Sequence, residues 1–357
     1  MTRLTCFDVL IVYTETVTTS ASDPSCLTPF ASNSRYESYN AVYGYFLEVC
    51  QKFNLNAAFA TSADIIGPGF CHSFWTFKDS QWLKTKSPCF SYLIFDKFSP
   101  TTPIAKSRRQ LLFSDSKIKP FNAPDLFNLF FDKQLTYEKL SGHSIPTISI
   151  GDKTLQSIKD ACQTLTELMS HHPGFNDFSS DIIMKDKFGA GGRHIHKFKT
   201  GQTKKMLTTI RHNSNISYVI QPFAKFDQGF NLHNHLVASD IRLIYLNGQI
   251  VQSYVRVAKS GDFRCNEYQG GLLTYLPLND IPASLVAKSN SIAKALDNDC
   301  SLYTLDFIIS NSGNAYLLEG NTNPGLDWNT QPTENEVEAK KLIGLVVQEL
   351  AVRAALV

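Results

Sequence analysis

A glycine-rich string directly after a predicted strand is the first feature that could do chemistry. The string is Lys185-Asp-Lys-Phe-Gly189-Ala-Gly191-Gly192-Arg193, and the pattern of residues 181–185 is typical of a strand. Glycine lets backbone N–H groups approach a polyphosphate closely, and a neighbouring lysine neutralises its charge. The string is not a Walker P-loop, because no Gly-Lys-Ser/Thr follows the glycines, and it does not match Gly-x-Gly-x-x-Gly. By itself it indicates either a phosphate-binding loop or a structural glycine-rich hairpin.

Two acids and an amide on neighbouring predicted strands form a second candidate site. Asp306 lies within one strand, and Glu319 and Asn321 share a face of the next because side chains alternate along a strand. Oxygen ligands that converge from adjacent strands suit Mg²⁺. A buried carboxylate is costly without a partner, and Asp306 lies inside the apolar run 305–309. This placement favours a metal site over the exposed face of an edge strand.

A third candidate site is a short basic segment that contains Arg256, Lys259, Arg264 and Asn266, followed by a glycine pair. Guanidinium groups and amides bind phosphate or carboxylate oxygens with forked geometry. The alternative interpretation is a solvated basic loop.

In this order, the three candidate sites resemble the ATP-grasp superfamily, and specifically its RimK-type carboxylate–amine ligases, which include glutathione synthetase-like enzymes. The matching strings are Asp132-Lys133, Ile182-Ile-Met-Lys185 with its glycine loop, Tyr218-Val-Ile-Gln221-Pro-Phe, Asp240-Ile-Arg242, Arg256 to Gly271, Leu305-Asp306, and Leu318-Glu319-Gly-Asn321-Thr-Asn323-Pro-Gly325. The resemblance implies an α/β (α+β) protein with the ATP-grasp fold. Two α+β subdomains would clasp ATP, and an α/β pre-ATP-grasp domain would precede them.

The resemblance implies a nucleotide-binding role for several residues. Lys133 and Lys185 match the two lysines that hold the ATP phosphates, and the loop with Gly189, Gly191 and Gly192 matches the lid over them. The remaining matches are Gln221, Pro222 and Phe223 in the hinge strand beside adenine, Asp240 as the nucleotide-binding acid, and Arg264 and Asn266 on the phosphate side.

The resemblance also implies a catalytic set and a metal site. Arg256 matches the arginine near the transferred phosphate and would act with Arg264 and Lys185. The magnesium ligands would be Asp306, Glu319 and Asn321. Two Mg²⁺ ions are expected, with Mn²⁺ as an acceptable substitute.

Two departures from the family pattern concern the hinge and the stretch after it. Pro222 stands where an acid is usual, and proline removes one backbone donor. Adenine recognition at the hinge is largely by backbone, so the pocket is expected to survive. Residues 224–239 form an insertion relative to the glutamate ligase, and it is either a determinant of substrate choice or a surface loop.

The chain is predicted to have three parts. They are a pre-ATP-grasp-like α/β domain at 1–118, an ATP-grasp N-terminal subdomain with the glycine-rich lid at 119–220, and a C-terminal subdomain with the magnesium site at 221–357. Helices are predicted at 38–53, 125–140, 155–170, 281–296 and 334–357. Strands are predicted at 8–13, 90–96, 145–150, 181–185, 195–198, 217–221, 240–246, 249–256, 303–310 and 314–321.

Composition and charge exclude several classes of protein. The 357 residues carry a net charge of +2, which argues against a dedicated nucleic-acid binder. Residues 119–220 contain 13 basic and 9 acidic residues, a net charge of +4, whereas residues 221–357 contain 10 and 14, a net charge of −4. A positively charged lid segment that faces a negatively charged metal-binding segment would produce this distribution. No apolar run approaches the length of a transmembrane helix, and the N-terminus is typical of a first strand rather than a signal peptide.

The cysteines and histidines do not indicate a metal site. The eight cysteines are scattered without a Cys-x-x-Cys pair, which favours reduced thiols in a cytoplasmic protein. The pairs His194/His196 and His233/His235 lack a third ligand nearby, so a solvated or core role is favoured.

The leading hypothesis is an ATP-dependent ligase that activates a carboxylate as an acyl phosphate and joins it to an amine, releasing ADP and phosphate. The substrates would be small molecules or peptides, neither nucleic acid nor membrane is an expected partner, and a homo-oligomer is among the expectations. The alternatives are an ATP-grasp kinase acting on a small-molecule hydroxyl, an ester- or lactam-forming peptide ligase, and a non-catalytic ATP-binding module.

Overall fold

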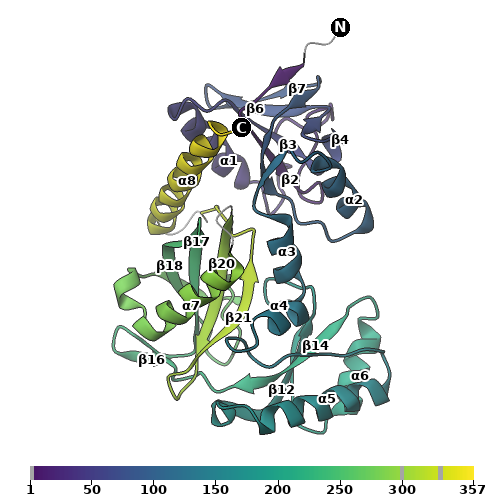
Figure 1. Ribbon diagram of the computed structural model, residues 1–357, viewed down its shortest axis with the longest axis vertical. Helices are drawn as coiled ribbons and strands as arrows, with labels where there is room; N and C mark the ends of the chain where they lie inside the picture. Colours follow the sequence, from purple (N-terminus) through teal and green to yellow (C-terminus); the bar gives the residue numbers. More distant parts are fainter. Residues whose placement is uncertain (1–3, 298–300, 329–332) are drawn as a thin grey trace. The chain divides into compact units, whose positions relative to one another are not determined.

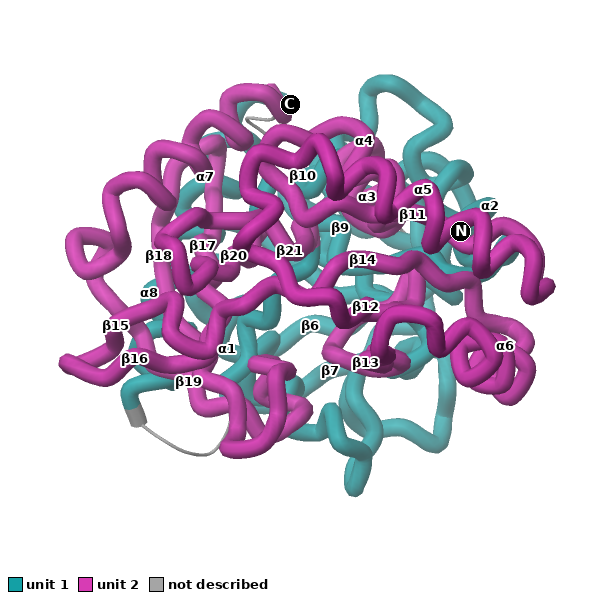
Figure 2. The backbone as a smooth tube through the Cα atoms, turned by 90° about the horizontal axis from the view of Figure 1, so that it is seen from below, with its two compact units in different colours: residues 1–124, 300–302, 323–357 teal, residues 125–299, 303–322 magenta. Residues whose placement is uncertain are grey.

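The computed structural model describes residues 4–297, 301–328 and 333–357, which group into two compact units (Figures 1 and 2). Unit 1 comprises residues 1–124, 300–302 and 323–357. Unit 2 comprises residues 125–299 and 303–322. The chain thus leaves unit 1 twice, after residues 124 and 302, and stays in it from residue 323 onward. The three functional parts with boundaries at 118 and 220 stay a prediction.

Unit 1 is built on a six-stranded sheet with the order β10-β9-β2-β3-β6-β7. The strands are β2 (Val9–Tyr13), β3 (Ala57–Thr61), β6 (Phe74–Lys78), β7 (Gln81–Thr85), β9 (Leu93–Lys97) and β10 (Lys119–Phe121). The first four in spatial order are parallel, and β6 and β7 add antiparallel pairs. Four successive residues of β2, from Val9 to Val12, are fully buried. Covering on both faces is typical of the central strand of a parallel sheet.

Helices and a second small sheet complete unit 1. The helices are α1 (Tyr39–Lys52), α2 (Pro103–Leu112) and α8 (Thr333–Ala354), and α1 packs beside α8 (Figure 1). The small sheet has the order β1-β8-β5-β4, with β1 at Thr5–Cys6, β8 at Cys89–Phe90, β5 at Phe70–Cys71 and β4 at Ile65–Gly67. The helices predicted at 38–53 and 334–357 and the strand predicted at 8–13 are therefore confirmed.

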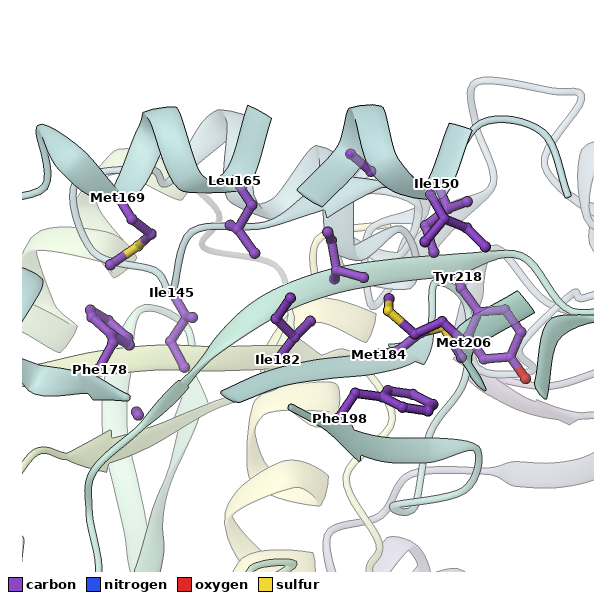
Figure 3. Close-up of a cluster of buried hydrophobic side chains, with 14 of the residues drawn as sticks. Ile145, Ile150, Leu165, Met169, Phe178, Ile182, Met184, Phe198, Met206 and Tyr218 are labelled. Carbon is purple, nitrogen blue, oxygen red and sulfur yellow. The ribbon is translucent and has the colours of Figure 1, made fainter. Parts of the chain in front are cut away.

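Unit 2 begins with four helices and a four-stranded sheet of order β11-β14-β12-β13. The elements are α3 (Pro124–Phe131), α4 (Lys133–Lys139), β11 (Ile148–Ser149), α5 (Leu155–Ser170), β12 (Phe178–Asp186), β13 (Ile195–Phe198), α6 (Thr203–His212) and β14 (Tyr218–Ala224). Leu165 and Met169 of α5 point toward the sheet that carries Ile182 and Met184 (Figure 3). Each fully buried side chain of this kind stabilises the fold by about 1.5–3 kcal/mol.

The second half of unit 2 is a five-stranded sheet of order β19-β18-β17-β20-β21 with α7 (Ala283–Leu296). Its strands are β17 (Ser239–Leu246), β18 (Gln249–Val257), β19 (Leu272–Tyr275), β20 (Leu302–Ile309) and β21 (Ala315–Asn321). The β17–β18 hairpin turns at Asn247-Gly248, where both residues have positive φ, as the Asn-Gly signal predicts.

Three predicted segments differ from the structure. The stretch 125–140, predicted to contain a helix, holds two, because Asp132 is extended and its carboxylate accepts the N–H groups of Gln134 and Leu135 at the start of α4. Of the strand predicted at 145–150, only β11 forms, in a segment whose Pro146 has no N–H to donate. The insertion at 224–239 contains a hairpin of β15 (Phe230–Leu232) and β16 (His235–Val237).

Among the described residues, no helix combines the length and apolar character that crossing a membrane requires. Seven cysteines lie in the described ranges and all are free thiols. The eighth, Cys300, lies outside them.

Candidate active site

Two buried lysines face a cavity in unit 2. Lys185 lies on β12 and Lys133 is the first residue of α4. The cavity, called the polar cavity below, is lined by Lys133, Lys185, Asp186, Gly189, Ala190, Gly192, Arg193, Ile195, Asp240, Asn266, Asp306, Leu318 and Glu319. Eight of the residues predicted from the sequence are therefore brought together on its wall. Asp186 and Ile195 were not predicted, although both flank the glycine string.

Burial disfavours the charged forms of these lysines. It lowers the pKa of Lys185 to about 7, and the neighbouring positive charge of Lys133 acts in the same direction while Glu319 opposes it. Burial also lowers the pKa of Lys133, with Glu319, Asp186 and Asp132 opposing. The side chain of Lys185 makes no hydrogen bond or ion pair with any residue in the described ranges. Lys133 donates to the Gly189 carbonyl, whereas the ammonium group of Lys185 has no such partner among the described residues and is positioned for an anionic ligand.

The predicted metal ligands lie on one face of the β20–β21 pair. Asp306 is directly opposite Glu319, and Thr304 is directly opposite Asn321 in the same antiparallel register. The period-two argument is therefore right about the shared face. Asp306 and Glu319 line the polar cavity, whereas Asn321 lies one pair further along and is not part of the lining.

A network of two arginines and two aspartates lies beside these residues, on the neighbouring strands β17 and β18. Asp240 on β17 is opposite Arg256 on β18, and Arg256 donates to its carboxylate at 2.7 and 2.9 Å. Arg242 donates to both oxygens of Asp306 at 2.7 and 2.5 Å, and Arg256 Nη2 donates to Asp306 Oδ2 at 2.8 Å. These charge-assisted bonds hold the pKa of Asp306 below its ordinary value against the effect of burial.

The position of Arg256 differs from a direct phosphate contact. Its side chain is buried, does not line the polar cavity, and is held by two acids that do. In this arrangement Arg256 positions Asp240 and Asp306. Its predicted role at the transferred phosphate stays a prediction. Arg242, which belongs to a family-like string, received no role from the sequence, because its pairing with Asp306 joins strands 64 residues apart.

The donor set on the acidic face fits a hard divalent cation. The side chain of Glu319 makes no hydrogen bond or ion pair within the described part of the chain, and it faces Asp306 across the strand pair. Like charges directly opposite on a sheet repel each other, and a cation between them relieves that repulsion. No group of three or more His, Cys, Asp or Glu residues suited to a metal occurs in the described ranges. Mg²⁺ commonly uses only one or two carboxylates together with water and phosphate oxygens.

The glycine string forms the loop between β12 and β13, on the opposite wall of the polar cavity. Gly191 and Gly192 have φ of 68° and 71°, a conformation that side chains disfavour. A Cβ on Gly192 would lie 2.7 Å from Asn266 Oδ1, so a side chain there would clash. Gly189 and Gly192 line the cavity, and Gly191 does not.

A second, more apolar cavity adjoins the first and shares Lys185, Ile195, Asp240, Asn266 and Leu318 with it. The other residues of this apolar cavity are Ile145, Ile183, Gln221, Pro222, Phe223, Ala224, Phe226, Phe263, Arg264, Cys265 and Ile308. The predicted hinge residues Gln221, Pro222 and Phe223 therefore line one cavity. Side chains such as Ile145 and Ile308 carried no sequence signal for a site, and Leu318 belonged to a family-like string without a role of its own.

The backbone of β14 explains why a proline is tolerated in the hinge. Tyr218 accepts from Ile150 N–H on the β11 side, and Lys225 N–H donates to Asp177 on the opposite side. Backbone groups alternate along a strand, so the Pro222 carbonyl and the Ala224 N–H point to the β11 side, beyond the end of that short strand. The donor that proline lacks would have pointed to the same unpaired edge. An acceptor and a donor two residues apart remain available there.

Arg264 and Asn266, which were predicted to lie together on the phosphate side, differ in the cavities that they line. Asn266 lines both cavities, whereas Arg264 lines only the apolar one and is paired with Asp262 at 2.7 Å. This pairing raises the pKa of Arg264 and lowers that of Asp262 to about 2. Direct contact between Arg264 and the phosphates stays a prediction.

The chain matches a family model described as the RimK-like ATP-grasp domain over residues 140–346, more than half of its length. The chain belongs to the RimK-like ATP-grasp family. The family drawn from the motifs is thereby confirmed. Residues 140–346 include every predicted site residue except Lys133.

Comparison with individual relatives gives the fold and a partial match in sequence. A probable alpha-L-glutamate ligase of Parasynechococcus marenigrum is 29% identical over 169 residues, which is 47% of this chain and 32% of the relative. The chain thus spans about a third of that relative's length. The match to the crystal structure of D-cycloserine synthetase has a TM-score of 0.58 at 12% identity. It covers 97% of this chain and 99% of the synthetase chain. The ATP-grasp ligase PsnB, in complex with a precursor variant, Mg and ADP, has a TM-score of 0.56 at 11% identity and covers 98% and 99%. The predicted ATP-grasp fold is therefore confirmed.

Proposed function

We propose that this protein is an ATP-dependent carboxylate–amine ligase that releases ADP and phosphate. The observation that carries the proposal is the pair of adjoining cavities. One wall of the polar cavity presents two buried lysines, the other presents Asp306 and Glu319, and the apolar cavity with the Pro222–Ala224 edge continues from it. A triphosphate with its cation fits the charges of the first cavity, and an adenine ring fits the second.

The chain supplies positioning and charge rather than a covalent nucleophile. Lys133, Lys185 and the backbone of the glycine loop would hold the phosphates of ATP. A substrate carboxylate oxygen would attack the γ-phosphorus, the bond from that phosphorus to the β–γ bridging oxygen would break, and ADP would leave. An amine would then attack the acyl phosphate and release inorganic phosphate.

Asp306, Glu319 and Asn321 would hold a divalent cation in this scheme. When bound, Mg²⁺ would neutralise negative charge on the phosphates. Arg242 and Arg256 would keep Asp306 ionised and oriented, since both donate to its oxygens. Two ions, and the ability of Mn²⁺ to replace Mg²⁺, belong to the same proposal.

The substrate class follows from the relatives only in outline. Relatives carry the names alpha-L-glutamate ligase and D-cycloserine synthetase, and the PsnB structure holds a precursor. We infer a small-molecule or peptide carboxylate and a small-molecule or peptide amine as substrates. A cytoplasmic location and self-association belong to the proposal as well.

The test is ADP release from Mg·ATP in the presence of panels of amino acids and peptides, with added hydroxylamine and mass analysis of the products. A ligase forms a hydroxamate, because hydroxylamine intercepts the acyl phosphate, and forms an amide with the true amine. A stable phosphorylated product without hydroxamate would show a kinase instead. ATP binding without ADP release under every combination would show a non-catalytic module.

A further inference from the structure

The outer edge of β13 has no partner strand. In the order β11-β14-β12-β13 this strand comes last, and among the described strands it pairs with β12 alone. The Asp186 N–H donates to the His194 carbonyl at 3.3 Å, which fixes the groups of β13 that point toward β12. Because backbone groups alternate along a strand, the N–H and C=O groups of Ile195 and Lys197 point away from the sheet. They make no hydrogen bond with any residue that the structure describes.

The chain around this edge is strongly basic. Residues 187–226 contain eight Lys or Arg residues and no Asp or Glu. The exposed cations of β13, of the residue after it and of α6 form what is called the basic edge below: Lys197, Lys199, Lys204, Lys205 and Arg211. Asp181 pairs with Lys197 at 3.2 Å and with Lys199 at 3.0 Å. The three cations of α6 make no ion pair within the described ranges, so most of this positive charge has no counterpart in the protein.

Helix α6 and strand β13 are held together by a shared core. Phe198 of β13 lies in one cluster of buried side chains with Met206 and Ile210 of α6 (Figure 3). Since residues four apart share a face of a helix, Met206 and Ile210 define the buried face of α6, and Lys204 and Arg211 lie on its exposed part. The cations of α6 and the unpaired groups of β13 therefore keep fixed positions relative to one another.

An extended peptide is the partner that matches such an edge. Its backbone presents alternating N–H and C=O groups, which can add a strand to an open sheet edge. Nucleic acid offers no regular row of such groups. A second copy of the chain would bring Lys197 against Lys197, and lysines on edge strands hinder pairing of that kind. Acidic side chains on the added strand would instead complement the charge of the basic edge.

We propose that the outer edge of β13 binds an acidic segment of a peptide or protein as an added strand. The bound segment would lie beside Ile195, which lines both cavities. This docking site goes beyond the proposed function, because the backbone groups and cations that form it were given no part in nucleotide binding. Its tests therefore need neither nucleotide nor activity.

The first test measures binding of the fluorescein-labelled peptide amide Glu-Val-Glu-Val-Glu-Val-Glu to the full chain by fluorescence anisotropy. Alternation places all four glutamates on one face of an extended strand. The matched control is the same peptide with N-methyl groups on its three central residues, which keeps the charge and removes donors from both edges of the peptide. The control is expected to bind about tenfold more weakly or worse, because two hydrogen bonds are lost. Equal affinities would overturn the added strand.

Nucleic acid is compared in the same assay. The probe is a fluorescein-labelled thymidine pentanucleotide, whose four phosphates match the four glutamates in number. The peptide is expected to bind more tightly, since only the peptide can pair with the backbone of β13. Tighter binding of the oligonucleotide would overturn the proposal and assign the basic edge to nucleic acid.

The second test changes the charge of the protein. The double variant Lys204→Gln/Lys205→Gln is expected to bind the acidic peptide about two- to fivefold more weakly, the range of exposed ion pairs. The matched control is Lys106→Gln/Lys117→Gln, which removes two exposed charges from unit 1 and should leave the affinity unchanged. Equal losses in the two double variants would show attraction to net charge alone and would overturn the docking site.

The third test removes one backbone donor from the open edge. Lys197→Pro deletes an N–H that points away from β12, a position where a strand tolerates proline, and Lys197→Gln deletes only the charge. The proline variant is expected to bind the peptide about three- to tenfold more weakly than the glutamine variant. Equal affinities of the two variants would overturn the pairing at Lys197. If Lys197→Pro does not fold, the N-methylated peptide still decides the proposal.

Discussion

Lys185 in unit 2 and Lys97 in unit 1 are buried to a similar degree and have different neighbours. Their exposed fractions are 7% and 4%, and burial lowers the pKa of each to about 7. Lys97, the last residue of β9, donates to the Pro324 carbonyl at 2.8 Å and has Asp327 and Asp96 nearby to favour its charge. Lys185 has no partner among the described residues, and its closest charged neighbours include another lysine.

The difference shows that a lowered lysine pKa reports burial and does not by itself identify a ligand site. Lys97 fastens the segment after residue 322 within unit 1, so its cost of burial is offset inside the protein. The cost of burying Lys185 is opposed by the charge of Glu319, and an anion in the polar cavity would offset it further. Neighbouring atoms, rather than the direction of the pKa shift, distinguish Lys97, which is bonded within the protein, from Lys185, which we propose binds the nucleotide.

The largest expected effect is on nucleotide binding when Lys185 is replaced by methionine, which is similar in length and uncharged. Affinity for Mg·ADP is expected to fall about a hundredfold, because a charge-assisted contact to phosphate is lost. The free energy of unfolding is expected to stay within about 1 kcal/mol or to rise, since a buried cation is removed. Calorimetric titration and urea unfolding measure the two quantities. Retained affinity would mean that Lys185, like Lys97, has no role in nucleotide binding.

Replacing Lys97 by methionine is the reciprocal change and is expected to act on stability. The Pro324 carbonyl would lose its donor and Asp327 its cation, so unfolding should become easier by about 1–3 kcal/mol. Mg·ADP affinity should stay within about twofold, because Lys97 is not on the wall of either cavity. Urea unfolding and calorimetry on the same sample decide the case. A large loss of affinity at unchanged stability would reverse the assignment of the two lysines.

Helices and strands with a clear hydrophobic period could be predicted from the sequence, whereas several turns and breaks between them could not. Helix α5 matches its predicted ends because Thr154 caps it and Ile158, Leu165 and Met169 repeat at helical spacing. The β6–β7 hairpin could not be placed, because its turn uses Asp79 and Ser80 with positive φ rather than glycine. Local patterns carry propensity, but a turn built from unusual residues leaves little local signal.

The candidate site shows the same limit at longer range. Lys185, Asp306 and Glu319 could be predicted because each has a diagnostic neighbourhood: a glycine string, an apolar run or a strand register. The pairing of Arg242 with Asp306 and the contact of Arg193 with Tyr268 join residues far apart in the chain. Such contacts depend on how strands are ordered in a sheet, and no short motif encodes that order.

Replacing Glu319 by glutamine is expected to have a smaller effect than either lysine change and sharpens the description of the site. The Mg²⁺ concentration needed for half-maximal ADP binding should rise about tenfold, the lower range for altered metal-site groups. The variant also removes a negative charge that favours the charged form of Lys185, so the pKa of Lys185 should fall further. Mg²⁺ titration of ADP binding tests the first effect. The control is Glu349→Gln, an ion-paired helix residue in unit 1 that should leave the titration unchanged.

The smallest expected effect is the pH dependence of nucleotide affinity in the unmodified protein. Without ligand, Lys185 has a pKa of about 7, well below its ordinary value. Phosphate favours the charged form, so the pKa rises on binding and the complex takes up a proton above pH 7. Affinity for Mg·ADP should therefore be level below pH 7 and fall above it, by at most about tenfold per pH unit for each such lysine. Lys133, whose pKa is also lowered, adds to the fall.

Calorimetric titration from pH 6 to 9 measures this profile, and the comparison of the two lysines supplies its control. The Lys97→Met variant should keep the profile, because Lys97 titrates in a region that the nucleotide does not touch. The Glu319→Gln variant should begin to lose affinity at lower pH, because the pKa of Lys185 has moved down. A profile that flattens in Lys97→Met would place the titrating group in unit 1. Such a result would transfer the functional role from the lysine without a partner to the lysine with one.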